Sequence, residues 1–260
     1  MGSPVLDGKV AFVAGASRGI GRDVARALAA AGAGVVVAAR SETEGKLPGT
    51  IHSVADGIRA TGGDAFPVVC DVSSEESVTA AVDEAVRHYG GLDVLVANAG
   101  VVWLPKVLDT PLKRWELCMR INLTGVFLVT KAVMPHVMAR GSGSMIAITT
   151  TGVRQVELGS NAYWASKAGV ERLYAGLAVE LAPHNVAVNC LAPNKVVMTE
   201  GAIAGGMQVP DDMIEAPEAM GAAAVWLASQ DASGVTGTVQ YSLDVVERLG
   251  LPLTPLPVAE

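Results

Sequence analysis

Short apolar runs alternate along this chain with longer segments in which apolar residues recur every three or four positions. Runs of the first kind are typical of buried strands, and segments of the second kind are typical of helices. The predicted strands are Val10–Ala14, Val35–Ala39, Ala65–Val69, Val94–Ala97, Met145–Thr149, Val186–Leu191 and Val239–Ser242. The clearest predicted helices are Gly21–Ala31, Glu75–Tyr89, Ala162–Leu181 and Pro217–Ala228. This alternation favours crossover connections, so we expect an α/β fold: a doubly wound parallel sheet of about seven strands with helices on both faces.

The chain has 260 residues without a repeat or a linker rich in proline or serine, which favours a single domain over residues 1–260. Two stretches lack a clear period. Residues 41–49 are polar and contain Gly and Pro, and residues 194–215 mix Gly, Met and acidic residues. For residues 194–215 two interpretations are open, a lid over a substrate and an ordinary surface loop.

Composition and charge argue against some classes of partner. Hydrophobic residues make up 50% of the chain and charged residues 17%, which allows a large buried core. The formal net charge is −7 and no basic run is present, so nucleic acid is not expected as a partner. The longest apolar stretch, Leu117–Met138, is interrupted by Arg120 and Lys131, so no membrane partner is expected either.

Cysteine and histidine usage bears on metal binding and on the compartment. Cys70, Cys118 and Cys190 form no CxxC pair, and the four histidines lack metal-ligand spacing, so no metal site is expected. Scattered cysteines in an odd number suit a reducing compartment. The N-terminus lacks the basic and apolar regions of a signal peptide, and the expected location is the cytoplasm.

Three glycines follow the first predicted strand, in the segment GASRGIG at residues 15–21. Gly15 permits a sharp turn, Gly19 leaves room for a phosphate beside the backbone, and Gly21 lets a helix pack closely against the sheet. The N–H groups that begin the helix then face the anion. A tight turn in any α/β protein is the competing interpretation. The position at the first strand–helix junction favours a dinucleotide cradle of the Rossmann type.

The spacing GxxxGxG resembles that of the short-chain dehydrogenase/reductase family, and four further segments carry the same resemblance. CDV at residues 70–72, VANAG at 96–100, INLTG at 121–125 and YWASK at 163–167 are similar to that family's adenine-contacting aspartate, NNAG element, catalytic-asparagine helix and YxxxK motif. The resemblance covers residues 9 to about 193 and implies a nicotinamide-dependent oxidoreductase. Residues 46–51 are similar to the hydroxysteroid-dehydrogenase-like branch, from which we carry over no substrate.

The resemblance also implies which residues form the site. The expected cofactor-binding residues are Gly15, Ser17, Arg18, Gly19, Ile20, Gly21, Arg40, Asp71, Val72, Asn98, Ala99, Gly100, Tyr163, Lys167, Pro193 and Val196. The expected catalytic residues are Asn122, Thr150, Tyr163 and Lys167.

The end of the second predicted strand bears on the choice of cofactor. An acidic side chain there would bind the adenosine 2′-hydroxyl and repel a 2′-phosphate. This chain has Ala39 followed by Arg40, and Arg18 lies in the glycine segment. Two guanidinium groups can clamp a phosphate, whereas two solvated arginines are the competing interpretation. We therefore expect NADP(H), with NAD(H) as the alternative.

Tyr163 and Lys167 are four residues apart in a predicted helix, which places both side chains on one face. A free tyrosine has a pKa of about 10, and a neighbouring ammonium favours the phenolate. Tyr163 can therefore exchange a proton with a substrate oxygen, and the resemblance adds that Lys167 binds the nicotinamide ribose. Alone, the pair would be a surface Tyr and Lys on an amphipathic helix; the glycine cradle favours the catalytic interpretation.

A third catalytic hydroxyl is expected at the end of the fifth predicted strand. The family places a serine thirteen residues before its tyrosine, where this chain has Thr150. Threonine keeps the hydroxyl donor, and Thr149 is the rival because Gly152 follows it at the family's usual interval. Asn122 is expected, from its family position, to hold a water that relays protons from the lysine. A buried asparagine that satisfies backbone groups is the alternative.

The chain departs from the family pattern at several positions. Ala14 replaces a threonine, Asn194 replaces the glycine after Pro193, and Val245-Val246 replace a glycine pair. Asparagine tolerates left-handed backbone conformations better than most residues, so the turn at Asn194 is expected to survive.

Three functions are open on the sequence. The first is an NADPH-dependent carbonyl reductase for a small apolar substrate, with a pocket drawn from Trp103, Leu104, Val153, Met198 and Met207. The second is an NAD(H)-linked alcohol dehydrogenase, and the third is a cofactor-binding protein with little turnover. The resemblance further implies a homodimer or homotetramer that associates through residues 111–138 and 162–181, and the apolar segment Leu249–Val258 is a further candidate contact.

Overall fold

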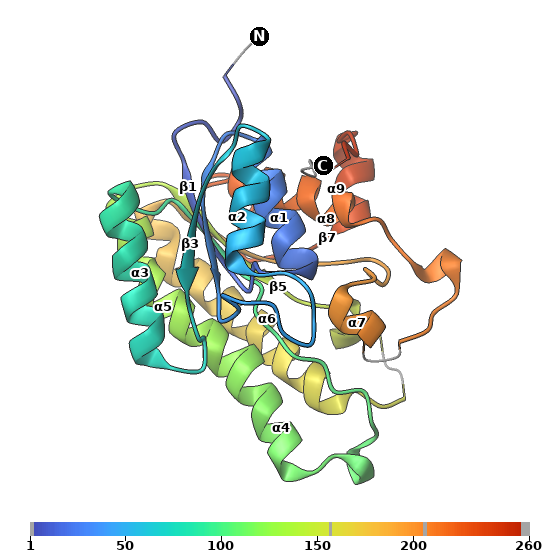
Figure 1. The fold of residues 1–260 in the computed structure, drawn as a ribbon. Helices are drawn as coiled ribbons and strands as arrows, with labels where there is room; N and C mark the ends of the chain where they lie inside the picture. Colours follow the sequence, from blue (N-terminus) through green and yellow to red (C-terminus); the bar gives the residue numbers. More distant parts are fainter. Residues whose placement is uncertain (1–2, 156–157, 205–206, 256–260) are drawn as a thin grey trace.

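The computed structural model describes residues 3–155, 158–204 and 207–255 (Figure 1). Its centre is a seven-stranded sheet in the order β3-β2-β1-β4-β5-β6-β7, and every neighbouring pair is parallel. The strands are β1 (Val10–Ala14), β2 (Gly34–Ala39), β3 (Asp64–Val69), β4 (Val94–Ala97), β5 (Gly143–Ile148), β6 (Val186–Ala192) and β7 (Val239–Tyr241). The predicted doubly wound parallel sheet is confirmed.

The strand sequences explain why the sheet lies in the middle of the protein. β1, β4, β5 and β6 are buried along their whole length, and they are built from Val, Ala, Ile and other small or apolar residues. A strand that is covered on both faces needs such a continuous apolar run instead of an alternating one. The strand order reverses between β1 and β4, and a crevice is expected at the carboxyl ends of these strands.

Helices cover both faces of the sheet (Figure 1). One core cluster joins the sheet to α3, α5 and α6, and the other joins it to α1, α2, α8 and α9. The α-helices are α1 (Gly19–Ala30), α2 (Ile51–Ala60), α3 (Glu75–Tyr89), α4 (Leu112–Cys118), α5 (Gly125–Ala139), α6 (Asn161–Leu181), α7 (Glu200–Ala204), α8 (Pro217–Ala228) and α9 (Ser242–Leu249). Because the chain alternates between strand and helix, the carboxyl ends of all the strands face the same edge.

The helical stretch Leu112–Ala139 has a π-helical turn at Met119–Thr124 between α4 and α5. By length and composition alone this stretch could cross a membrane. However, Val126, Val129 and Val133 of α5 belong to the core beneath the sheet. The core helix of a globular domain meets the same criterion of length and hydropathy.

Residues 194–215 form a loop whose two ends are tied together. Val196 pairs with Ile214, and the Lys195 N–H donates to the buried carboxylate of Glu215 at 2.8 Å. Between these ends the described residues contain α7 and a 3₁₀ turn, Asp211–Met213. We call residues 196–214 the loop; its base is fixed, and α7 lies at the carboxyl edge of the sheet (Figure 1).

One element differs from the sequence prediction in kind. The last strand stops at Tyr241, and Ser242 begins α9, where the sequence predicted a strand through Ser242. Asn194 supplies the physical reason, because its side-chain oxygen accepts from the Leu243 N–H at 2.7 Å and its amide donates to Asp244 at 2.7 Å. An oxygen acceptor for a first-turn N–H stabilises a helix start.

Candidate active site

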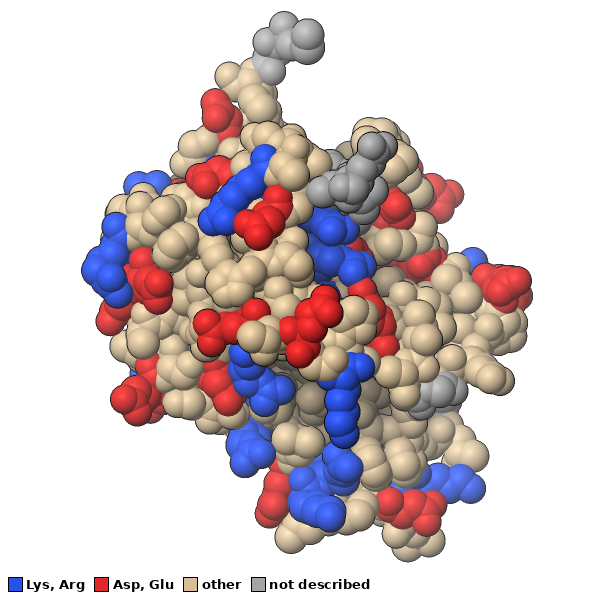
Figure 2. All heavy atoms as spheres, in the orientation of Figure 1, with Lys and Arg blue, Asp and Glu red and all other residues tan. Residues whose placement is uncertain are grey.

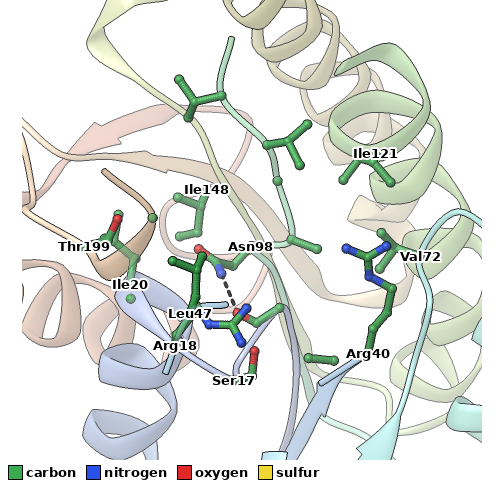
Figure 3. A pocket seen from close by; sticks show the side chains of 18 of the residues that line it. Ser17, Arg18, Ile20, Arg40, Leu47, Val72, Asn98, Ile121, Ile148 and Thr199 are labelled. Carbon is green, nitrogen blue, oxygen red and sulfur yellow. Dashed lines mark hydrogen bonds between the residues drawn. The ribbon is translucent and has the colours of Figure 1, made fainter. Parts of the chain in front are cut away.

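The glycine cradle connects β1 to α1, and its glycines are required by close approaches. Gly15 has a φ of 81°, and a Cβ there would lie 2.6 Å from Ala99 Cα. A Cβ on Gly21 would overlap the Gly15 carbonyl oxygen. Asn98 reinforces the turn, since its side-chain amide donates to the same carbonyl at 2.9 Å (Figure 3). A side chain at Gly21 would push α1 away from the turn after β1, and one at Gly15 would push that turn away from Ala99 after β4.

A cavity of about 430 Å³ opens in front of this cradle, at the carboxyl ends of β1, β4 and β5. It lies within the usual size range of small-molecule sites. Fourteen of the expected site residues line it: Gly15, Ser17, Arg18, Gly19, Ile20, Arg40, Val72, Asn98, Ala99, Gly100, Thr150, Tyr163, Lys167 and Pro193. Residues that lie far apart in the sequence therefore meet at one cavity with a phosphate cradle, a charged side and a hydroxyl side. This residue set fits a nicotinamide dinucleotide.

Arg18 and Arg40 lie on two sides of the cradle end of the cavity (Figure 3). The Arg18 guanidinium donates to the carbonyls of Pro48 and Gly49 at 3.0 and 2.8 Å and to the Ser41 hydroxyl at 3.1 Å. These contacts fix residues 41–49 against the cradle and bring Leu47 to the cavity. Arg40 is exposed. Burial opposes a lower pKa of Asp71, but hydrogen bonds from Ser73 hold that pKa below its usual value, and the charge of Arg40 adds to their effect.

Basic side chains also gather on the protein surface near the carboxyl edge of the sheet. Lys and Arg side chains gather just below the centre of the view in Figure 2, in the region where Figure 1 places the carboxyl edge of the sheet. An acidic protein can therefore still present positive charge to a phosphate-bearing ligand.

Tyr163 and Lys167 project from α6 into the cavity, one helical turn apart. Lys167 is 3% exposed, its Nζ donates to the Ile148 carbonyl at 2.7 Å, and it lies 5.9 Å from the centre of the Tyr163 ring. Burial raises the pKa of Tyr163 to about 12 and lowers the pKa of Lys167 to about 8. Tyr163 is therefore a protonated acid near neutral pH.

The two rival threonines at the end of β5 point to different partners. The Thr149 hydroxyl donates to Glu171 Oε1 at 2.9 Å, and Thr149 is buried. Thr150 is only partly buried, and its hydroxyl oxygen accepts a long hydrogen bond of 3.3 Å from the Gly152 N–H. Among the described residues no acceptor takes the Thr150 O–H hydrogen, so it can donate into the cavity, whereas that of Thr149 is already used.

Asn122 lies behind the cavity in the π-helical turn and is fully buried. Its oxygen accepts from the Val101 N–H at 2.8 Å, and its amide donates to the Val101 carbonyl at 2.9 Å and to the Ser166 hydroxyl at 3.0 Å. Both amide hydrogens are used, so the side chain cannot donate to a water. The contacts are those of the buried asparagine named as the alternative, and the relay stays a prediction.

Several expected residues lie outside the lining of the cavity. Val196 uses its N–H on Met213 and its carbonyl on Glu215, and Asp71 accepts from Ser73. Gly21 acts through the packing described above. Among the described residues, those expected to line a substrate pocket (Trp103, Leu104, Val153, Met198 and Met207) do not line this cavity either. Apolar residues that do line it include Val101, Val102, Ile121 and Ile148.

The profile of short chain dehydrogenases matches residues 9–204. The chain belongs to the short chain dehydrogenase family. The chain is 37% identical over 197 residues to the Homo sapiens protein named hydroxysteroid dehydrogenase-like protein 2, a match covering 75% of this chain and 47% of that protein. It thus spans about half the length of the curated relatives it matches.

Solved structures of several dehydrogenases share the fold of this chain. A putative dehydrogenase from Xanthomonas campestris is 35% identical with a TM-score of 0.86 over 97% of this chain and 94% of its own. Carveol dehydrogenase from Mycobacterium avium, solved with NAD, is 30% identical with a TM-score of 0.83 over 92% and 97%. A gluconate 5-dehydrogenase from Burkholderia cenocepacia, solved with NADP and tartrate, is 31% identical with a TM-score of 0.81 over 92% and 95%. Both nicotinamide dinucleotides therefore occur in proteins of this fold.

Three residues near the site were not assigned to it from the sequence. Glu171 holds Thr149, Leu47 closes one side of the cavity, and Glu200 contacts the cradle from α7. The partners of Glu171 and Glu200 are 22 and 181 residues away along the chain. Gly49 lets residues 41–49 approach the cradle, because a Cβ there would overlap the Ser17 carbonyl oxygen.

Proposed function

We propose that this short chain dehydrogenase is an NADP(H)-dependent oxidoreductase that interconverts a ketone or aldehyde and an alcohol. One observation carries the proposal: Thr150, Tyr163 and Lys167 line the same cavity as the glycine cradle. A bound nicotinamide dinucleotide would supply or accept the hydride. The residues of the chain then hold the substrate oxygen and move its proton.

The proton is assigned to Tyr163. Burial keeps its hydroxyl protonated near neutral pH, so it donates to the oxygen of a carbonyl substrate. Lys167 holds an ammonium on the same face of α6, and its positive charge favours the phenolate that remains after the donation. The free Thr150 hydroxyl hydrogen can donate to the same oxygen as negative charge develops there.

The preference for NADP(H) is supported by charge at the cradle end of the cavity. β2 ends at Ala39, so no carboxylate occupies the position that binds a 2′-hydroxyl. Arg18 and Arg40 both line the cavity, and residues 41–49 keep Arg18 in place. A fixed guanidinium loses less conformational freedom when it pairs with a phosphate.

An apolar carbonyl compound or alcohol is the proposed substrate class. The wall of Val101, Val102, Ile121 and Ile148 offers aliphatic contacts beside the hydroxyls of Thr150 and Tyr163. Apolar walls with a few convergent polar groups are typical of small-molecule sites.

A panel of ketones and alcohols with NADPH and with NADH tests the activity, followed by absorbance of the reduced nicotinamide. Tyr163→Phe removes the proton donor and should lower kcat at least 100-fold, as expected for general acid catalysis. Tyr174→Phe is the matched control, because Tyr174 lies on the same helix but its hydroxyl pairs with Thr130 in the core. A silent panel with tight NADPH binding would favour a cofactor-binding protein without turnover.

Arg40→Asp tests the cofactor preference. It should weaken NADPH binding by tenfold or more and leave NADH binding the same or stronger, because a carboxylate repels only the 2′-phosphate. Arg87→Asp, on the exposed side of α3, changes the net charge equally and should leave both affinities unchanged. Equal losses of NADPH and NADH affinity in Arg40→Asp would contradict the clamp and favour the NAD(H)-linked alternative.

A further inference from the structure

Glu200, the first residue of α7, reaches from the loop to the glycine cradle. Its Oε2 accepts a hydrogen bond of 3.0 Å from the Gly19 N–H, and its Oε1 pairs with Arg22 of α1. The loop lies close to Gly19: a Cβ on this glycine would lie 3.0 Å from Thr199 Cγ2 and 3.8 Å from Glu200 Oε2. Thr199 also lies beside Ile20 at the edge of the cavity in Figure 3. A carboxylate of the chain therefore occupies the front of the cradle.

The charge of Glu200 suits this place. Gly19 begins α1, and the N–H groups at a helix start carry partial positive charge. Burial raises the pKa of Glu200, but hydrogen bonds from backbone N–H groups and the Arg22 guanidinium outweigh burial and hold it below the usual value. Glu200 is thus an anion near neutral pH. The same N–H group is the part of the cradle that faces the pyrophosphate of a dinucleotide.

We propose that Glu200 is a latch residue whose carboxylate competes with the pyrophosphate of the dinucleotide for the Gly19 N–H. Two anions cannot share one donor, so the carboxylate leaves Gly19 when the pyrophosphate binds there. The two contacts of Glu200 use different carboxylate oxygens, and Arg22 can keep its partner after Gly19 is released. The loop that carries Glu200 thereby senses whether the cradle is filled. The inference rests on the nicotinamide dinucleotide of the proposed function.

The affinity of the cradle for anions tests the latch directly. We would measure dissociation constants of ADP-ribose, NADPH and NADH by calorimetry for the wild type and for Glu200→Gln. Glutamine keeps the size and one oxygen acceptor but removes the charge. The substitution should lower all three dissociation constants by about threefold to tenfold, because the three ligands share the pyrophosphate.

Asp212→Asn is the matched control. Asp212 lies on the same loop, is exposed, and belongs to the short 3₁₀ turn away from Gly19. It changes the net charge by the same amount, and its dissociation constants should stay within about twofold of the wild type. Equal tightening in Asp212→Asn and Glu200→Gln would overturn the latch, because overall charge would then explain both. Unchanged or weaker binding in Glu200→Gln would overturn it too.

A second readout does not depend on any ligand. Glu200→Ala removes the acceptor, so the Gly19 amide should exchange its hydrogen with solvent faster than in the wild type and in Asp212→Asn. Equal exchange in all three proteins would overturn the contact itself. Failure of the proposed function looks different: the wild type and Glu200→Gln would then both bind ADP-ribose while neither NADPH nor NADH supported turnover of any substrate in the panel.

Discussion

Two neighbouring threonines at the end of β5 differ in which hydrogen-bond partner the side chain reaches, and this difference determines which hydroxyl can act in catalysis. Thr149 and Thr150 have the same functional group and both reach the cavity lining. Glu171 takes the hydroxyl hydrogen of Thr149, and Thr150 keeps its own. The family pattern predicted a hydroxyl at this point, and spacing alone left both residues open. The hydrogen-bond partners distinguish them: Glu171 of α6 binds Thr149, whereas the Gly152 N–H of the following 3₁₀ turn binds Thr150.

Thr150→Val should therefore affect catalysis, and Thr149→Val should affect stability. The first should lower kcat by about 100-fold, the usual cost of one donor to a developing oxyanion, and leave NADPH binding unchanged. The second should change kcat by less than threefold but lower the free energy of unfolding by about 1 kcal/mol through the lost bond to Glu171. Steady-state kinetics and urea denaturation give the two numbers, and the reverse order would assign the hydroxyl donor to Thr149.

Lys167 makes a residue-scale prediction for pH. Its pKa is lowered to about 8 in the folded protein, so burying its charge opposes folding below pH 8, and this cost is relieved as the pH rises toward the unfolded value. Lys167→Met removes the cost. Lys167→Met should therefore stabilise the protein relative to the wild type, and this gain in the free energy of unfolding should be about 2 kcal/mol larger at pH 7 than at pH 9.5.

The measurement is urea denaturation at both pH values, with Lys113→Met as the control because Lys113 is exposed on α4. The control should show the same difference from wild type at pH 7 and pH 9.5. A difference for Lys167→Met that does not vary with pH would mean that Lys167 keeps an ordinary pKa in the folded protein.

At the scale of elements, α9 depends on a residue outside its own sequence. The side chain of Asn194 satisfies the Leu243 N–H from across the carboxyl edge of the sheet. The family's usual glycine could not do this, and the departures at Asn194 and at Val245-Val246 are two parts of one arrangement. Val245 is fully buried in the core that also holds α1 and α8.

Asn194→Gly restores the family's residue and should destabilise the protein. The expected loss is about 1 kcal/mol in the free energy of unfolding, typical of a lost helix cap. Thermal or urea unfolding would measure it, with the exposed Asn161→Gly at the start of α6 as a comparison for the general cost of glycine. A loss no larger than that of Asn161→Gly would show that the cap contributes little.

Local patterns predicted the strands well and predicted contacts between distant segments poorly. Buried parallel strands are continuous apolar runs, so β1 to β6 could be located to within one or two residues at each end. The cradle and the Tyr163–Lys167 pair were found because each is a short motif on one junction or one helix. Asn194, Glu171 and Glu200 could not be assigned, because their partners are brought together by the sheet.

At the scale of the whole molecule, two helices leave apolar side chains on the surface. Phe127 on α5 is 45% exposed and Val179 on α6 is 77% exposed. We propose that copies of the chain associate through these helices, as the family resemblance predicts, because exposed apolar groups of this size favour an interface.

Sedimentation velocity tests the association. Wild-type protein should sediment as a dimer or a tetramer, and Val179→Glu should shift it toward smaller species because a charge would be buried at the interface. Val5→Glu is the control, since Val5 is also exposed but lies at the N-terminal end of the described chain. A wild-type monomer would contradict the association, and an oligomer that Val179→Glu does not change would contradict this interface.

The π-helical turn between α4 and α5 determines how the side-chain faces of α4 are rotated about the helix axis relative to those of α5. Residues three and four apart share a face of an α-helix, and each residue advances the direction of the side chain by about 100°. Removing one residue from Met119–Thr124 would let the stretch run as a plain α-helix, but α4 would then rotate by about that angle relative to α5. The valines of α5 could stay on the sheet only if Asn122 turned away from Val101. The additional residue in this turn thus lets one continuous helical stretch pack its α5 valines in the core and also direct Asn122 toward Val101 beside the site.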